Sequence, residues 1–202
     1  MKLYGNTSAS NCRRVTLYLA AKGLPLELVD VDLATGQNKT PQFLAKNPAG
    51  LIPVLELDDG STLPESSAIV EYLEERFPEP PLMGRTPEAR SKVRALERIA
   101  SDLAVLTAIL FQHSHPRFAG RMKQFPDAAE AVRPLVNAQL SALEQHLGSK
   151  PFLAGEQLTT ADITLFTLFQ FCRERLDVPF AKEYPALDAW YARFAKRPGV
   201  GY

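Results

Sequence analysis

The sequence has little cysteine: only Cys12 and Cys172 occur among its 202 residues, with no Cys-x-x-Cys pair. Structural disulfides and a zinc site are therefore not expected, and a reducing cytoplasm suits such a chain. No stretch approaches the roughly 20 apolar residues that cross a bilayer. The segment from Met1 to Gly5 lacks the apolar core of a signal peptide. We expect a cytoplasmic protein without a metal site and without membrane association.

An excess of charge of either sign is also missing. Lys plus Arg and Asp plus Glu both number 23, so the formal net charge is zero. Nothing in the global charge attracts the chain to nucleic acid or to an anionic membrane. Hydrophobic residues make up 46% of the sequence, which suits one large domain or two small ones with a packed core.

The first part of the chain alternates strands and helices. Gly23 is placed to end a first helix, Thr40-Pro41 to begin a second, and Asp58-Asp59-Gly60 to turn a hairpin. The order predicts a compact α/β unit with a mixed four-stranded sheet. The expected strands are 2–4, 27–32, 53–57 and 61–63, and the expected helices are 12–22, 41–46 and 65–77.

Three prolines within residues 78–81 form a stiff linker, which predicts a domain of residues 1–78 and a second of residues 87–202. Helices are expected at about 87–119, 127–147, 159–176 and 184–196, which predicts an all-helical bundle. Thr159 with Asp162 three residues later forms a capping box, a structural signal for a buried helix.

Two short motifs point to a ligand. If the Ile52-Pro53 bond is cis, the backbone of Ile52 turns outward and can pair with an extended peptide as an added strand. Glu65 and Ser66 fall at a helix start, where free N–H groups favour a carboxylate and the Glu65 side chain can take an ammonium group. Each motif alone is more often structural, but together they predict a site for a small zwitterionic peptide.

These motifs resemble those of the cytosolic glutathione S-transferases. The resemblance implies a thioredoxin-like N-terminal domain, a helical C-terminal domain, a homodimer, and glutathione as co-substrate. The matching segments, which span nearly the whole chain, are Leu3–Gly23, Asn47–Leu55, Glu65–Ile69, Thr159–Asp162 and Arg197–Val200.

The resemblance also implies roles for single residues. Ile52, ahead of Pro53, would pair with the cysteinyl backbone of glutathione, and Glu65 and Ser66 would hold the γ-glutamyl end.

The glycine carboxylate of glutathione would lie near Asn38 and Lys39, although Asn38 departs from the His often found in relatives. Lys39 is otherwise a solvated loop lysine. Leu51 stands where Lys or Gln is common, so only its backbone can contribute.

The loop before the first helix should activate the thiol of glutathione. The serine of serine-type relatives falls on Ala9, whose methyl group donates no hydrogen bond. We favour Ser10 as the donor, with Asn11 and Ser8 behind it. Ser8, Ser10 and Asn11 are also suitable helix N-caps, the alternative role for Ser10.

Cys12 offers a redox alternative. As a thiolate of low pKa at a helix start it could form a mixed disulfide with glutathione, but a buried side chain that acts as a small hydrophobe is the favoured interpretation. Tyr4 is a weaker hydroxyl donor, since it lies in a strand.

An electrophile would bind between the domains, where Phe111 and His113 are the named candidates among Leu110, Phe111, His113, His115 and Phe118. His113 and His115 cannot both face one side of a helix, so a metal pair is not expected and solvent exposure is the default for both. A solvated helix face is the default for each of five arginines that could otherwise serve the cleft or the dimer contact: Arg13, Arg14, Arg90, Arg94 and Arg98. The leading function is glutathione conjugation to small apolar electrophiles in detoxification; the alternatives are Cys12-dependent disulfide or peroxide reduction and non-catalytic glutathione binding.

Overall fold

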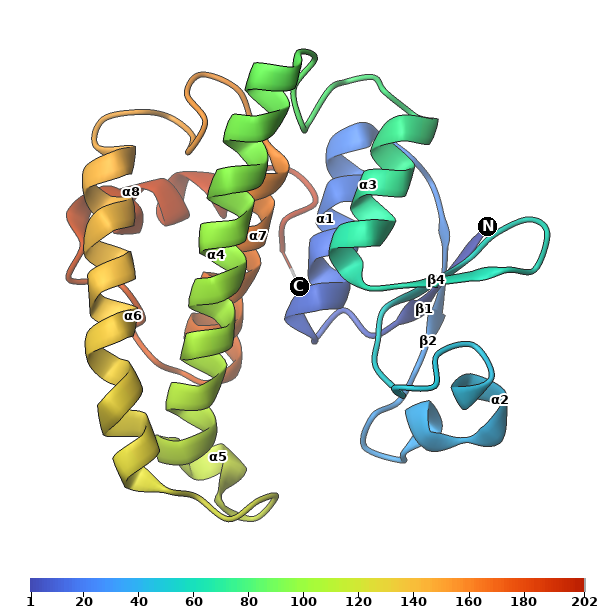
Figure 1. The fold of residues 1–202 in the computed structure, drawn as a ribbon, viewed down its shortest axis with the longest axis horizontal. Helices are drawn as coiled ribbons and strands as arrows, with labels where there is room; N and C mark the ends of the chain where they lie inside the picture. The colour runs from blue at the N-terminus through green and yellow to red at the C-terminus, as the bar shows by residue number, and fades with distance from the viewer. Residues whose placement is uncertain (202) are drawn as a thin grey trace. The chain divides into compact units, whose positions relative to one another are not determined.

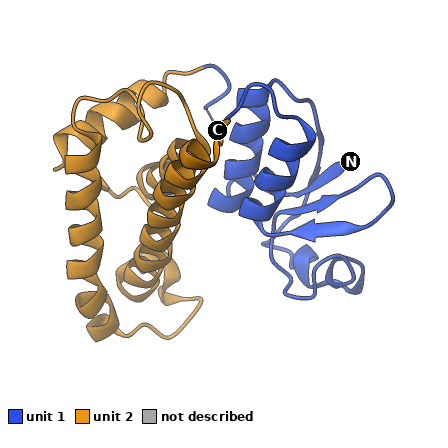
Figure 2. Ribbon diagram, turned by 45° about the horizontal axis from the view of Figure 1, so that its top comes forward, with its two compact units in different colours: residues 1–82, 198–202 blue, residues 83–197 orange. Residues whose placement is uncertain are grey.

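The computed structural model describes residues 1–201, which form two compact units (Figure 2). One unit comprises Met1–Leu82 and the chain from Pro198 onward, and the other comprises Met83–Arg197. The domain of residues 87–202 expected from the sequence includes the closing residues. They belong to the first unit because the buried Arg13 guanidinium donates to the carbonyl oxygens of Val200 and Gly201.

The first unit has a mixed four-stranded sheet, as expected (Figure 1), and its strand order is β2-β1-β3-β4. Strand β1 pairs in parallel with β2, whereas β3 runs antiparallel to both β1 and β4. Helices α1 and α3 pack against each other. The elements of this unit are β1 (Lys2–Gly5), α1 (Ser10–Lys22), β2 (Glu27–Asp30), η1 (Gln37–Lys39), α2 (Pro41–Leu44), β3 (Val54–Glu56), β4 (Thr62–Pro64) and α3 (Ser66–Arg76).

The two faces of the sheet follow the alternation of side chains along its strands. Tyr4 and Val54 pack with Phe43 of α2 on one face, while Leu3 and Leu55 are buried on the other. The sheet is therefore covered on both faces.

Helix ends in this unit follow local chemistry with one exception. Gly23 ends α1 at φ 66°, and the Thr40 hydroxyl accepts from the Phe43 N–H ahead of α2. The N-cap of α1 is Ala9, which has no capping side chain, and Ser10 is already the first helical residue. The expectation of an N-cap at Ser8, Ser10 or Asn11 is therefore wrong.

A buried charge network extends this unit to Leu82. The Lys22 ammonium lies 2.6 Å from the Glu74 carboxylate and donates to the Pro80 carbonyl. Glu74 also accepts from the Tyr18 hydroxyl and from the Leu82 N–H. A buried carboxylate requires such partners, and these fix the proline-rich segment against α1 and α3.

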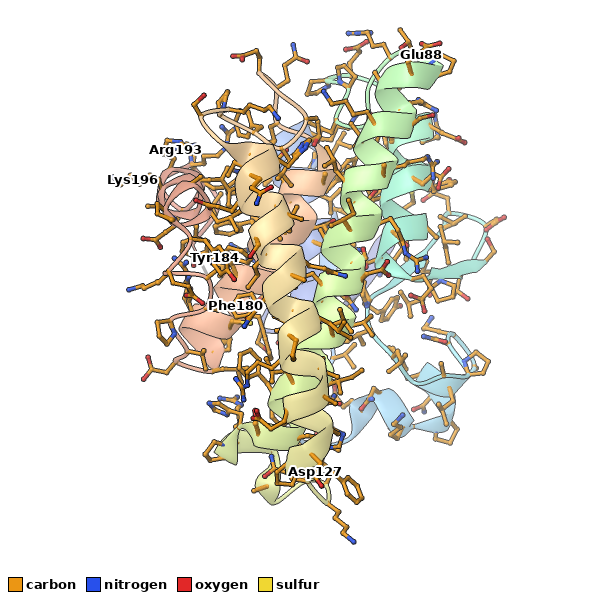
Figure 3. The ribbon with its side chains drawn as sticks, turned by 60° about the vertical axis from the view of Figure 1, so that its left-hand side comes forward. Glu88, Asp127, Phe180, Tyr184, Arg193 and Lys196 are labelled. Atoms are coloured by element: carbon orange, nitrogen blue, oxygen red, sulfur yellow. The ribbon has the colours of Figure 1, made fainter. Side chains whose placement is uncertain are left out.

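The second unit is all-helical, as expected. The predicted first helix divides at His115, because the residue before Pro116 is restricted from helical geometry. Helices α4 and α6 lie side by side (Figure 3) and α7 packs against α4. The elements are α4 (Pro87–Ser114), α5 (Pro116–Ala119), α6 (Pro126–Leu147), α7 (Thr160–Gln170), η2 (Phe171–Arg175) and α8 (Pro185–Phe194).

The capping box ahead of α7 is confirmed. The Asp162 carboxylate accepts from the Thr159 N–H at 3.0 Å and from the Thr159 hydroxyl at 2.8 Å, and it also accepts from the Leu153 N–H. Every residue of α7 is buried, so the cap anchors the central helix of the unit. Among the helices of residues 1–201, none is long and apolar enough to span a membrane.

Candidate functional site

Sheet topology brings the predicted ligand-binding motifs to one end of the first unit. Val54 at the start of β3 pairs with Tyr4 near the end of β1 and with Pro64 at the end of β4. The loop after β1, the segment ahead of β3 and the start of α3 therefore leave the sheet at the same end. This places Ile52 and Glu65 near each other although they are distant in sequence.

The segment ahead of β3 is held by amide side chains. The buried Asn47 donates from Nδ2 to the Leu51 carbonyl at 2.8 Å, and its Oδ1 accepts from the Ala49 N–H at 3.1 Å. The Asn38 amide donates to the Gly50 carbonyl at 2.7 Å. Gly50 has φ 63°, a conformation suited to glycine. The loop is thus fixed before any ligand arrives.

Ile52 has the backbone geometry that a strand-like ligand requires. The Ile52-Pro53 peptide bond is cis. Within residues 1–201 neither the N–H nor the C=O of Ile52 makes a hydrogen bond, while its side chain packs against the cluster around Phe43 and Val54. The side chain is anchored and the backbone remains available to a peptide.

The start of α3 combines a strained backbone conformation at Glu65 with backbone N–H groups that have no acceptor within the helix. Glu65, the N-cap residue, has φ 71° and ψ 114°, unusual for a residue with a side chain, and it is exposed. The first helical bond runs from the Ile69 N–H to the Glu65 carbonyl at 2.9 Å. The N–H groups of Ser66, Ser67 and Ala68 therefore have no acceptor within the helix, which suits an anion.

Ser66 is only 4% exposed, and its Oγ accepts from Nη1 of the buried Arg14 at 3.2 Å. Because the oxygen accepts from Arg14, the hydroxyl proton is left to donate to a ligand carboxylate. Arg14 is not solvated, in contrast to the default interpretation of the sequence, and the same holds for Arg13.

The pair predicted for the glycine carboxylate lies against the loop ahead of β3. The Asn38 side-chain amide already donates a hydrogen bond to the Gly50 carbonyl. Lys39 is exposed and makes only long contacts of 3.4 and 3.5 Å to the carbonyls of Ala49 and Gly50. Its ammonium remains the stronger candidate for a carboxylate. Leu51 exposes its side chain, and its carbonyl is taken by Asn47.

The loop after β1 is organised by Asn6. The Oδ1 of Asn6 accepts from both the N–H and the hydroxyl of Ser8, and its Nδ2 donates to Asp30 at 3.0 Å. The Asn6 N–H points to the sulfur of Cys12 at 3.4 Å. Since the Ser8 proton is donated to Asn6, Ser8 is poorly placed to donate to a ligand thiol.

Cys12 is fully buried, as the favoured interpretation expects. Burial raises the pKa of its thiol to about 11, with a smaller increase from Asp30, although the Asn6 hydrogen bond lowers it. A Cβ on Gly5 would lie 2.7 Å from the sulfur, so the strand packs directly on it. A protonated and enclosed thiol does not suit the redox alternative.

Ser10 and Asn11 remain as donors at the start of α1. Within residues 1–201 neither side chain makes a hydrogen bond, and Asn11 is exposed while Ser10 is half-buried. Helical bonding begins from the Arg13 N–H to the Ala9 carbonyl at 2.9 Å. The N–H groups at the start of α1 are left without a helical acceptor or a side-chain cap. Tyr4, in turn, lies on the sheet with its ring 4.5 Å from the Lys46 ammonium.

The residues predicted to contact an electrophile diverge within the helical unit. The Phe111 ring meets Phe180 edge to face, with centroids 6.0 Å apart. His113 accepts from the Phe125 N–H at 3.3 Å and contacts the Phe125 ring. His115 is tied to the Leu176 carbonyl at 2.9 Å. The default of solvent-exposed histidines is therefore wrong: both are half-buried and hold loops in place.

Sequence reasoning missed three supporting residues: Asn6, Arg14 and Asn47. The signal for Asn47 was its position before a proline in a loop rich in small residues, where Asx turns form. Arg14 carried no such signal, because only the packing of α1 against α3 shows that it reaches Ser66.

Two family models match the chain. Residues 3–81 match the glutathione S-transferase N-terminal domain, and residues 104–198 match the glutathione S-transferase C-terminal domain. Glutathione S-transferase 2 of Saccharomyces cerevisiae is 32% identical, over 99% of this chain and 88% of the relative. Maleylacetoacetate isomerase of Pseudomonas aeruginosa is also 32% identical, over 94% of this chain and 86% of the relative.

Solved structures agree with these matches. The crystal structure of Gtt2 from Saccharomyces cerevisiae is similar with a TM-score of 0.84 and 31% identity, covering 99% of this chain and 98% of that one. The glutathione transferase URE2P6 from Phanerochaete chrysosporium, in complex with oxidized glutathione, has a TM-score of 0.83 and 26% identity, covering 98% and 92%.

Proposed function

The chain belongs to the glutathione S-transferase family, and on that premise we propose that it conjugates the thiol of glutathione to small, largely apolar electrophiles in the cytoplasm. The observation that supports this proposal is that three segments lie at one end of the sheet. They are the loop after β1, the segment ahead of β3 and the start of α3. Together they offer hydrogen-bond donors and acceptors for the cysteinyl and γ-glutamyl parts of a zwitterionic tripeptide, and Lys39 of η1 offers a cation for its glycine carboxylate.

Glutathione is held at its backbone and at both ends. The cysteinyl unit pairs with the N–H and C=O of Ile52, as an added strand would. The γ-glutamyl carboxylate accepts from the N–H and hydroxyl of Ser66, and the exposed Glu65 carboxylate takes the ammonium group. Lys39 pairs with the glycine carboxylate, with Asn38 in support through the Gly50 carbonyl.

The thiol is ionised by the start of α1. The free hydroxyl of Ser10 donates to the sulfur, and the unsatisfied N–H groups of the first turn add positive potential. Asn11 is the second donor. A thiol with a reference pKa of about 8.5 is mostly protonated at neutral pH, so this stabilisation decides the rate of attack.

The electrophile is proposed to bind beside α4 against Phe111 or His113, whose side chains contact different partners. The working molecule is proposed to be a homodimer. The reaction forms a bond between the sulfur and an electrophilic carbon, and the leaving group departs with the electron pair of the broken bond. The thiol proton passes to solvent.

A second candidate, glutathione binding without catalysis, is favoured by Ala9. Its methyl group occupies the position at which serine-type relatives carry their donor, and the α1 N-terminus has no side-chain cap. In this case the site binds glutathione but leaves the pKa of its thiol unchanged.

Turnover of chlorodinitrobenzene with glutathione tests the proposal. We expect activity above the uncatalysed rate, a loss of about 10- to 100-fold in kcat for Ser10→Ala, and little change for Cys12→Ala. Activity lost in Cys12→Ala but kept in Ser10→Ala, with both variants folded, overturns the assignment. Tight glutathione binding without turnover across a panel of electrophiles supports the second candidate.

A further inference from the structure

The helical unit contains a cavity of about 330 Å³ that is lined by residues of α4, α6 and the segment after η2. Buried Leu110, Val136 and Leu140 supply its apolar part, and the rings of Phe111 and Phe180 add an aromatic edge-to-face pair. In Figure 3 the labelled Phe180 lies beside α6. The volume falls within the range of about 300–1,000 Å³ that is usual for small-molecule sites.

The wall formed by the segment after η2 is rigidly held. The side chain of Arg173, 9% exposed, donates from Nε to the Phe180 carbonyl at 2.8 Å and from Nη1 to Asp188 at 2.7 Å. Asp177 and Ala181 adopt φ 56° and 59°, conformations that residues with side chains rarely take. Such conformations persist only when their surroundings enforce them. The cavity wall is therefore preorganised.

Two charged residues line the cavity, Arg133 and Glu183, and they differ in their partners. Arg133 is already paired with Glu130 at 2.9 Å, so its charge is balanced. Glu183 lines the cavity, is exposed, and has no ion pair within residues 1–201. The neighbouring Lys182 is exposed and does not line the cavity. Of the two charged lining residues, Glu183 is therefore the one without an ion pair among residues 1–201.

We propose that this cavity binds a small organic cation: a primary amine carried on an aromatic or branched apolar body. The ammonium group pairs with Glu183, and the body lies among Leu110, Val136, Leu140 and the two phenylalanine rings. The aromatic rings also attract a cation through their faces. An anionic ligand would have to displace Glu130 from Arg133 and would meet Glu183 as a like charge.

Phe111 is shared with the electrophile contact proposed above, but this inference does not rest on that contact, because the cavity is formed within the helical unit and binding needs no glutathione. Isothermal titration without glutathione compares three probes that share one body: 4-phenylbutylamine, 4-phenylbutan-1-ol and 4-phenylbutyrate. Glu183→Gln removes the charge while keeping the shape, and Glu156→Gln removes an exposed carboxylate that does not line the cavity. Asn137→Trp, at an exposed helix position on the rim, covers the cavity.

We expect the amine to bind most tightly, and Glu183→Gln to weaken it about two- to fivefold, as for an exposed ion pair. The alcohol should be unaffected by this change, Glu156→Gln should leave all three probes unchanged, and Asn137→Trp should reduce binding of the amine and the alcohol alike. The proposal is overturned if no probe binds, if the butyrate binds most tightly, or if amine affinity is unchanged in Glu183→Gln. Cooperative thermal unfolding of each variant confirms that it is folded.

Discussion

Ser66 combines two hydrogen-bonding roles in one buried hydroxyl. Its oxygen accepts from Arg14, which leaves its proton for a ligand carboxylate. We expect Ser66→Ala to weaken glutathione binding by about tenfold or more, the range of a hydrogen bond to a charged group. Isothermal titration measures the change, with the exposed neighbour Ser67→Ala as the matched control. Equal affinities of the two variants would contradict the assignment.

Cys12 makes stability depend on alkaline pH. Its pKa is raised from 9.0 to about 11 in the folded chain, so the unfolded state releases the thiol proton first. The associated stability is fully present below pH 9 and is lost as pH rises towards 11. We expect the free energy of unfolding in urea to fall by about 1 kcal/mol between pH 8 and pH 10 because of this residue.

The matched control for that experiment is Cys12→Ala, which retains Cys172 and the other groups that titrate at alkaline pH. The wild type should lose more stability than this variant between the two pH values. An equal loss would show that the thiol ionises as readily in the folded state as in the unfolded state.

At the residue scale, the sequence predicted side chains whose role follows from local pattern. Glu65 and Ser66 could be proposed as ligand contacts because a helix start itself creates an anion site. The donor role of Ser8 could not be judged, since it depends on Asn6 turning its amide toward the loop. Arg14 could not be assigned, because its partner lies on another helix.

At the scale of elements, the start of α3 stores backbone strain at the proposed glutathione site. Glu65 has φ 71°, which costs on the order of 1–3 kcal/mol in a residue with a side chain. Glycine tolerates this conformation but loses more entropy on folding. We expect Glu65→Gly to raise the free energy of unfolding by about 1 kcal/mol while weakening glutathione binding, as measured by urea unfolding and titration.

Glu65→Gln separates the two effects, because it keeps the strained backbone and loses the carboxylate. It should bind glutathione weakly without any gain in stability. If Glu65→Gly is no more stable than Glu65→Gln, the strain at this position is not relieved by glycine and the interpretation fails.

The presence of the helices and strands could be predicted from the sequence, whereas some of their ends could not. Pro41 after Thr40 and Gly23 after α1 mark their helix ends by fixed backbone preferences. The start of α1 has no such mark, since Ala9 occupies the N-cap although polar residues flank it. At this helix start the Cys12 side chain packs directly against Gly5 of β1, a tertiary contact that the local sequence does not reveal.

At the scale of the whole molecule, the chain passes between its two units twice, near Leu82 and near Pro198. The sequence predicted the first passage from its prolines. It could not predict the second, because the signal is a buried arginine, Arg13, that donates to the closing carbonyl groups only in the folded chain. The family assignment covers both units, and the glutathione site proposed here is built from the first.

The pKa of the bound glutathione thiol tests the central claim most directly, since it joins binding to activation in one quantity. It is measured by ultraviolet titration of the thiolate in the saturated complex, for the wild type and for Ser10→Ala. We expect the pKa to lie at least about one unit below the reference value of about 8.5 in the wild type and to return towards it in Ser10→Ala. A pKa at or above the reference value in the wild-type complex would contradict the proposed transferase mechanism.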